Sequence, residues 1–489
     1  MTIHISTHYK KSLEDKGYEV VGYRTQSKSE QQQHYFAINL HENLGEGMFG
    51  SVYKAYRIDA QTNTLSSQPV AVKIYKNKSE FSEKEAEFLK RYYWVQGPVH
   101  SHGKIYLFTD ILPGEEISKD MHVKNKTDEE VQCIKLNDML KKLNFEERIA
   151  VLFSIMTQID LIHHETVSTG SPIIHADLKG ENIRVHIQMG PDNKVKKINV
   201  FVYDFGLSHE GEHNPNALIK TIQSGTALYV APEILSDPDD DYGMRGLKSD
   251  IYSLVPIFVA ILNGSDPFKY KNEFYKNRMI VNVKQFFNLS YNIDDILQDI
   301  ALPPYPFNIK KYLLAFLGRM QKFIYFERPD SHEALRFFTL LNNFCLAHQG
   351  LQATGEKISD DDCVIIQAKL ALLCAGLYYH DVSGTQPALS QPMKEYQPPA
   401  SSTEKITFED YSFENNIDVC KQIIKLFQNN ELNEKTLLGA LNRDFIQKEI
   451  VREASQKQGI KSKSLFGDKK KAHDQKHEKV IVVKKSGYL

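Results

Sequence analysis

The pattern of apolar and polar positions divides the chain into a strand-rich first part and a helical remainder. From Tyr35 onward, short stretches alternate apolar and polar side chains, as half-buried strands do. The segment 69–75 alternates around a single lysine, and 104–112 is an apolar strand that runs into a Pro-Gly turn. At 145–164 apolar positions recur at three- and four-residue spacing, which predicts a buried helix.

Helical patterns dominate the rest of the chain. We expect a helix at 331–341, a strongly apolar helix at 363–379 and amphipathic helices at 418–430 and 434–454. Between them, 382–402 has the prolines and polar residues of a linker. These patterns set apart an N-terminal segment at 1–37, a helical C-terminal domain at 350–455 and a lysine-rich tail at 456–489 that is typical of disorder.

Two regions give weaker signals. Residues 18–23 alternate like a short strand, but nothing in the sequence places that strand. Residues 115–143 are charged and poorly patterned, so we expect an insertion or a polar helix there.

Composition and charge add few constraints. With 489 residues, 41% of them apolar and 25% charged, the chain is long enough for roughly two or three ordinary globular domains. The formal charge of −2 gives no general reason to expect nucleic-acid or membrane binding. The five cysteines are scattered and form no Cys-x-x-Cys pair, which disfavours disulfides and zinc and favours a reducing compartment. The N-terminus lacks an apolar signal segment, and the longest apolar run, 254–262, is too short to span a bilayer, so we expect a cytoplasmic protein.

The richest candidate chemistry lies in 175–182, His-Ala-Asp-Leu-Lys-Gly-Glu-Asn, a polar stretch predicted to be a loop. A strand end that runs into Asp204-Phe-Gly follows it. Asp177, Asn182 and Asp204 carry short oxygen ligands that suit Mg²⁺ together with substrate phosphates. Lys179 adds a positive charge. A base, two metal ligands and a cation are what phosphoryl transfer to a hydroxyl requires.

A glycine-rich stretch, Gly45-Glu-Gly47-Met-Phe-Gly50, lies upstream. Such a motif also marks dinucleotide-binding turns, but those open a helix. Here β-forming residues follow, which favours strand–turn–strand, with glycines that let the backbone close over phosphates. An ordinary glycine-rich hairpin is the alternative.

His-x-Asp-Leu-Lys-x-x-Asn and Asp-Phe-Gly resemble the catalytic loop and metal-binding motif of eukaryotic-type serine/threonine protein kinases. Other family motifs follow in the expected order, from Val-Ala-Val-Lys73 to the Gly225-Thr-Ala-Leu-Tyr-Val-Ala-Pro-Glu233 ending. The resemblance covers about residues 38–346. It implies an α+β, bilobal protein-kinase-like fold with a β-rich N-lobe and a helical C-lobe, to which the chain adds an all-α C-terminal extension.

The resemblance also implies a role for each motif residue. Asp177 would act as the base that orients the acceptor hydroxyl, and Lys179 would steady the transferring phosphate. Asn182 and Asp204 would hold Mg²⁺. The residues that would bind ATP share the glycine loop, the lysine strand and the hinge: Gly45, Gly47, Gly50, Val52, Ala71, Lys73, Thr109, Asp110 and Leu112.

Supporting residues are implied in the same way. Lys73 would pair with Glu85 on a helix, with Glu87 as the alternative. His175 would pack under the loop and Asp250 would brace the loop backbone. Glu233 would pair with Arg328.

One departure concerns regulation. Ala176 stands where many members carry the arginine that pairs with an activation-loop phosphate. We therefore expect activity without phosphorylation of the loop hydroxyls Thr221, Ser224 and Thr226. This departure suggests a divergent member of the family. The chain thus resembles bacterial effector kinases such as those of Legionella, which work inside host cells.

The predicted function is transfer of the γ-phosphate of Mg-ATP to serine or threonine of a protein substrate. Two alternatives stay open: a pseudokinase scaffold, and a lipid or small-molecule kinase of the same fold. In either, the C-terminal helices could serve as a module that binds a protein or acidic lipid. No specific nucleic-acid partner is expected, and the oligomeric state is open.

Overall fold

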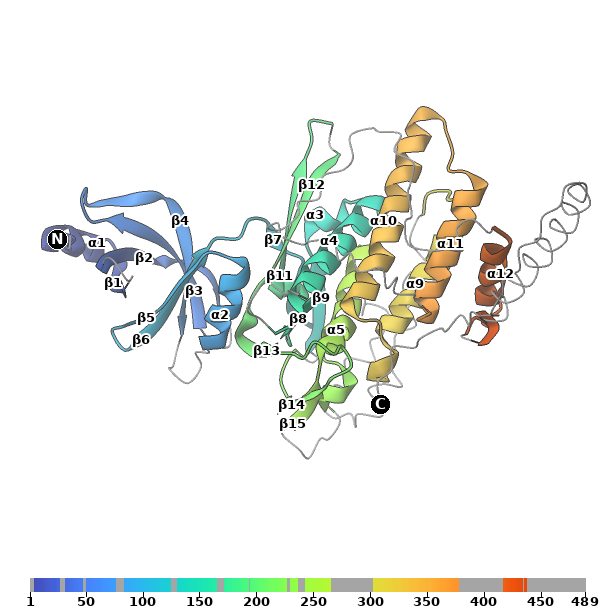
Figure 1. Ribbon diagram of the computed structural model, residues 1–489. Coiled ribbons are helices and arrows are strands. Elements are labelled where there is room, and N and C mark those ends of the chain that lie inside the picture. The colour runs from blue at the N-terminus through green and yellow to red at the C-terminus, as the bar shows by residue number, and fades with distance from the viewer. Residues whose placement is uncertain are drawn as a thin grey trace, which may run out of the picture. The chain divides into compact units, whose positions relative to one another are not determined.

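The computed structural model in Figure 1 forms two compact units, each described here by itself. The first contains the described residues up to 143 and those from 157 to 264; the second contains 144–156 and the described residues from 302 onward. The described residues are 4–26, 31–46, 50–75, 83–124, 130–164, 171–192, 194–226, 229–235, 242–264, 302–377, 417–433 and 435–437.

The first unit begins with a six-stranded antiparallel sheet in the order β1-β2-β3-β4-β6-β5. Its strands are β1 (Tyr18–Gln26), β2 (Gln31–Glu46), β3 (Gly50–Asp59), β4 (Thr64–Tyr75), β5 (Val95–Ser101) and β6 (Lys104–Asp110). Along β4, Val70, Val72 and Ile74 enter the sheet's core. Because side chains alternate between the two faces of a strand, Ala71 and Lys73 lie on the opposite face.

The N-terminal segment is part of this sheet. Helix α1 (Thr7–Asp15) places Leu13 in a cluster with Val20 of β1 and Ala37 of β2. The expected boundary at residue 38 therefore falls inside β2, and the short strand expected at 18–23 is the edge strand β1.

Of the two alternatives for 115–143, the polar helix was wrong for most of the stretch, and the insertion stays a prediction. The region contains β7 (Glu115–Glu116), β8 (Ser118–Lys124), β9 (Glu130–Leu136) and one short helix, α3 (Asp138–Lys141). Strands β8 and β9 pair antiparallel. A two-stranded ribbon is held by cross-strand partners, which its charged composition does not reveal.

The remainder of the first unit carries the loops of interest between short elements. Helix α2 (Glu83–Tyr92) follows β4, and α5 (Leu247–Asn263) is buried from Leu247 through Leu262 with Pro256 inside it. The strands are β10 (Ile173–Ile174), β11 (Ile183–Met189), β12 (Val195–Val202), β13 (His209–Glu210), β14 (Ile219–Ile222) and β15 (Tyr242–Arg245). The 3₁₀ turns are η2 (Gly180–Asn182), η3 (Phe205–Leu207) and η4 (Pro232–Leu235).

The second unit is helical, as expected for the C-terminal part. Its elements are the first half of α4 (Phe145–His164), then α9 (Ile309–Met320), η5 (Tyr325–Glu327), α10 (Ser331–Thr354), α11 (Asp360–Ala375) and α12 (Ile417–Gln428). Helix α11 packs against α9, α10 and α12, and the rings of Tyr312 and Phe427 stack at 5.0 Å between α9 and α12.

Several boundaries differ from the expected ones. Helix α10 begins at the expected residue, where Asp330 caps it, but it is longer than 331–341. It ends only at Gly355, which has a left-handed conformation. Apart from 435–437, the helix expected at 434–454 lies outside the described residues, as do the linker 382–402 and the tail 456–489. Within the described parts of the chain, every helix is too short or too polar to cross a membrane.

Alanine substitutions at Gly50 and Gly45 are expected to affect stability differently. A Cβ at Gly50 would lie 2.3 Å from the Ile74 carbonyl oxygen, whereas one at Gly45 would meet no heavy atom within 4 Å. We expect Gly50→Ala to lower the free energy of unfolding by about 1–3 kcal/mol, because β3 and β4 must separate. Gly45→Ala should change it little, which denaturant titration of both variants will measure. Equal stability of the two variants would contradict this account of Gly50.

Candidate active site

Lys73 lies between two carboxylates from distant parts of the chain. Its Nζ is 2.7 Å from Oε1 of Glu85 on α2 and 3.0 Å from Oδ1 of Asp204 after β12. Buried Glu85 also accepts a hydrogen bond of 2.8 Å from the Tyr75 hydroxyl. Burial alone would lower the pKa of Lys73, but Asp204 and Glu85 outweigh it and raise the pKa. Lys73 therefore remains a cation.

The alternative partner, Glu87, is directed elsewhere. It is exposed, and its Oε1 lies 3.4 Å from Nη2 of Arg91 on the same helix. Because residues two positions apart lie on nearly opposite faces of a helix, only Glu85 meets Lys73.

Asp204 has an unusual backbone conformation. Its φ of 62° is left-handed, which is rare for a residue other than glycine and marks functional sites. Burial would raise the pKa of Asp204, but Lys73 outweighs it and lowers the pKa, so the side chain is a carboxylate. The next residue, Phe205, is buried against three rings that hold this turn in place: Phe88, Tyr92 and His175.

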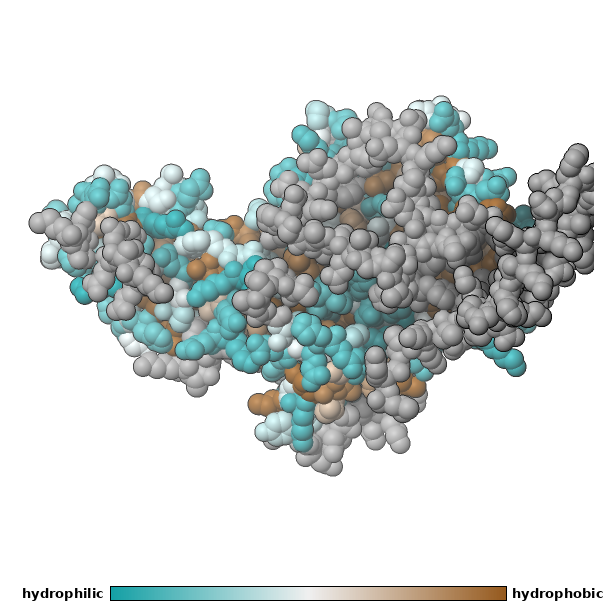
Figure 2. Space-filling model, viewed as in Figure 1, coloured by the Kyte–Doolittle hydropathy of each residue, from teal (hydrophilic) through white to brown (hydrophobic). Residues whose placement is uncertain are grey.

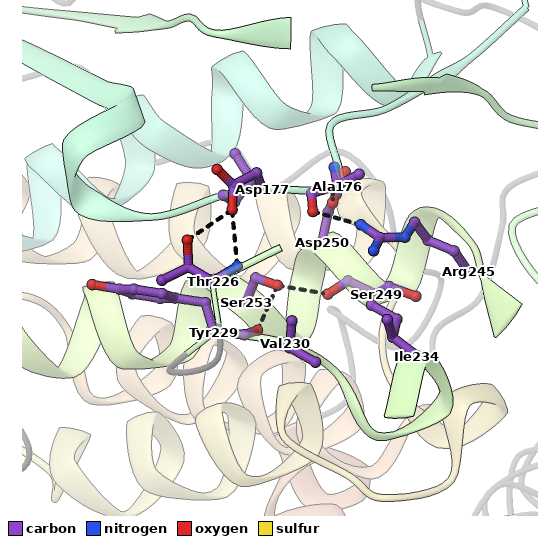
Figure 3. A pocket seen from close by; sticks show the side chains of 11 residues that line it. Ala176, Asp177, Thr226, Tyr229, Val230, Ile234, Arg245, Ser249, Asp250 and Ser253 are labelled. Carbon is purple, nitrogen blue, oxygen red and sulfur yellow. Dashed lines mark hydrogen bonds between the residues drawn. The ribbon is translucent and has the colours of Figure 1, made fainter. Parts of the chain in front are cut away.

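Asp177 accepts hydrogen bonds from two atoms of Thr226 (Figure 3), and the predicted loop residues Lys179 and Asn182 lie beside it. Its Oδ1 accepts hydrogen bonds from Thr226 N at 3.0 Å and Thr226 Oγ1 at 2.9 Å, and its Oδ2 accepts one from Asn182 Nδ2 at 3.1 Å. Lys179 Nζ lies 3.5 Å from Asp177 Oδ2 and 3.3 Å from Thr226 Oγ1. A carboxylate, a cation and an amide thus share one hydrogen-bonded cluster.

Asp250 in the first turn of α5 holds the backbone of this loop. Its carboxylate accepts hydrogen bonds from His175 N at 2.7 Å and Ala176 N at 3.0 Å, and lies 3.1 Å from His163 Nε2. Burial would raise the pKa of Asp250, but the hydrogen bond with His163 and further favourable interactions outweigh it and lower the pKa. Ala176 has a φ of 72°, so these bonds hold a conformation that an alanine rarely adopts.

Asn182 and Asp204 fit a hard cation that is completed by phosphates. Asn182 uses its amide nitrogen on Asp177 O at 2.8 Å and on Asp177 Oδ2, which leaves the amide oxygen as a ligand. Asp204 is ionised and 36% exposed. The described residues contain no cluster of three or more His, Cys, Asp or Glu suited to a metal. One carboxylate with one amide suits a Mg²⁺-like ion bound together with a nucleotide.

Most residues expected to bind the nucleotide lie on one face of the sheet. Directly paired residues share a face in an antiparallel sheet. Val52 pairs with both Gly45 and Lys73, and Ala71 pairs with Thr109.

The other expected nucleotide residues lie elsewhere. Asp110 pairs with Val70 and therefore lies on the opposite face, and Leu112 follows the end of β6. At Gly50 a side chain would collide with the backbone of the neighbouring strand, so strand packing requires glycine there. Gly47 lies outside the described residues.

Some contacts have no counterpart in the motifs. The Tyr75–Glu85 bond, the His163–Asp250 contact and the bonds of Arg245 join segments far apart in sequence, so no local pattern indicates them. Glu233 Oε1 accepts from Ser249 at 2.6 Å, and its expected pairing with Arg328 stays a prediction.

Comparisons with known proteins agree with this geometry. The family model described as "Protein kinase domain" matches residues 38–337. Serine/threonine-protein kinase 33 of Mus musculus is 27% identical over 240 residues, which are 47% of this chain and 42% of that protein. A probable serine/threonine-protein kinase of Dictyostelium discoideum is 28% identical over 320 residues, 63% of this chain and 42% of its own length.

A plant protein is also similar. The probable L-type lectin-domain containing receptor kinase S.7 of Arabidopsis thaliana is 24% identical over 250 residues, 49% of this chain and 31% of that protein. The chain therefore spans less than half the length of each of these relatives. Since the family match covers more than half of the chain, the chain belongs to the protein kinase family.

Proposed function

We propose that the chain is an ATP-dependent serine/threonine protein kinase that transfers the γ-phosphate of Mg-ATP to protein hydroxyls. The cluster around Asp177 carries this proposal, because its carboxylate already accepts a hydrogen bond from a hydroxyl, that of Thr226. An acceptor serine or threonine needs the same interaction.

The chain's own groups suit the steps of this reaction. Lys73, held by Glu85, would bind nucleotide phosphates beside the Val52–Thr109 face of the sheet. A Mg²⁺ ion held by Asp204 and Asn182 would neutralise charge on the phosphate oxygens. Asp177 would orient the acceptor hydroxyl and take its proton, and Lys179 beside it would stabilise the transferring phosphate.

A protein substrate is supported by the surface beside this cluster. Figure 2 shows apolar surface where β14 and β15 lie. Ile222 and Tyr242, which are cross-strand partners there, are 64% and 46% exposed. Exposed apolar side chains next to the Thr226 segment suit an extended peptide better than a small polar substrate.

We also propose that transfer does not need phosphorylation of the activation segment. The three candidate hydroxyls are already engaged: Thr221 is 8% exposed, Ser224 Oγ accepts from Arg245, and Thr226 Oγ1 donates to Asp177. A phosphate on any of them would have to break an existing contact.

Two expectations remain proposals about the whole protein. A reducing, cytoplasmic place of action, in the producing cell or in a host, agrees with Cys345, Cys363, Cys374 and Cys420, which form no disulfide, and cell fractionation would test it. Binding of a protein or acidic lipid by the C-terminal helices would be tested by sedimentation of the full chain with anionic vesicles.

Asp177→Asn should lower kcat at least a hundredfold, because the neutral amide cannot take the proton. ATP binding should persist, since Asp177 bonds within the loop. Transfer of labelled γ-phosphate to a generic protein substrate measures this, with Asp192→Asn on an exposed turn as the matched control. ATP binding without transfer by the wild type would favour a pseudokinase, and transfer to lipids or small molecules alone would favour that class.

Phosphatase treatment of the wild type should leave kcat unchanged within about twofold, because the segment is held without phosphate. Mass spectrometry verifies that the segment is unmodified before the assay. Activity abolished by phosphatase and restored by rephosphorylation would contradict this regulatory proposal and leave the enzyme assignment intact.

Asn182→Ala should raise the Mg²⁺ concentration for half-maximal rate by about tenfold or more, because one of two protein ligands is lost. Half-buried Asn199 on β12 provides the control substitution, Asn199→Ala. An unchanged Mg²⁺ requirement in Asn182→Ala would remove Asn182 from the metal site.

A further inference from the structure

A buried arginine joins the catalytic loop to the activation segment. Arg245 ends β15 and is 1% exposed. Its Nη1 donates to Ala176 O at 2.5 Å, and its Nη2 donates to Ser224 O at 2.7 Å and Ser224 Oγ at 3.2 Å. One guanidinium therefore bridges Ala176, the residue before Asp177 (Figure 3), and Ser224, two positions before Thr226.

The position of Arg245 is set by its strand. Strand β15 pairs with β14 of the activation segment, with Arg245 opposite Ile219. At Gly243 a Cβ would lie 2.1 Å from Ile234 O, so β15 approaches η4 as closely as a glycine permits. The Arg245 backbone is thus anchored on both sides, and the side chain extends from a fixed base to the two carbonyls.

The surroundings favour a cation at this place. The carboxylates of Asp250, Asp177 and Glu233 all act on Arg245 and oppose the decrease in its pKa that burial causes. A buried guanidinium remains charged under physiological conditions and presents its donors in a planar fork. A lysine has the charge but cannot reproduce the fork with one nitrogen.

We propose that Arg245 is a positioning residue for phosphoryl transfer: it holds segment 219–226 on the catalytic loop and thereby keeps Thr226 in contact with Asp177. This inference rests on the proposed function and specifies how that site dispenses with a phosphate. Ala176 offers no side-chain charge, so the cation that links the loop to the segment comes from β15.

The test compares Arg245→Lys and Arg245→Ala with Arg319→Ala in the second unit. Arg319 is also mostly buried and donates to Leu373 O at 2.8 Å and to Glu333. Neither partner belongs to the candidate site. Rates are normalised to titrated ATP-binding sites, and amide hydrogen exchange of residues 219–226 is followed in parallel.

We expect Arg245→Lys to lower kcat at least tenfold while the KM for ATP stays within twofold, because Lys73 and its partners are untouched. Exchange in 219–226 should become at least tenfold faster. Arg245→Ala should lower kcat more than Arg245→Lys does. Arg319→Ala should lower the melting temperature without changing kcat per site, which separates positioning from loss of a buried arginine.

Several outcomes would overturn the proposal. The first is a kcat within twofold of the wild type in both Arg245 variants. The second is a loss of activity that only matches the loss of titrated ATP-binding sites. If Arg245→Ala does not fold, Arg245→Lys decides. If the wild type transfers no phosphate, the proposed function fails separately. Unchanged amide exchange of 219–226 in Arg245→Lys would then also overturn the positioning role of Arg245.

Discussion

The site depends on a buried carboxylate, that of Asp250, which accepts hydrogen bonds from the backbone N–H groups of His175 and Ala176. Burying a carboxylate is costly unless hydrogen bonds and opposite charge compensate it. Here two amides and His163 do so, and the interaction in return holds Ala176 in a left-handed conformation. That bend sets the direction from which Asp177 enters the site.

Each charged group nearby is compensated by more than one partner. Lys73 forms ion pairs with Glu85 and Asp204, and Lys179 forms ion pairs with Asp177 and Glu181. Arg245 donates hydrogen bonds to two carbonyls beside acidic residues. Breaking a buried pair by removing one member typically costs about 3–5 kcal/mol, because the remaining charge is left uncompensated. Such shared contacts make the arrangement cooperative, so the segments that supply them are expected to order together.

In the proposed arrangement, Arg245 compensates for the uncharged side chain of Ala176 in the catalytic loop. Ala176 contributes a carbonyl where a charged side chain is common in the family, and Arg245 donates to that carbonyl from a strand 69 residues away in sequence. The pairing of β14 with β15 brings the arginine there. Local motif comparison detects Ala176, but it cannot detect Arg245, which we propose takes over the missing charge.

The residues themselves determined the parts of this protein that rest on local chemistry. The periodicity of 145–164 predicts α4 at its observed bounds, and the polar residues of 175–182 predict candidate groups that the structure joins around Asp177. Tertiary structure alone decided the β8–β9 ribbon, the place of β1 in the sheet and the roles of His163 and Arg245. The physical reason is that helix periodicity and loop polarity are encoded by neighbours along the chain. Strand partners and buried ion contacts are chosen among residues that become neighbours only after folding.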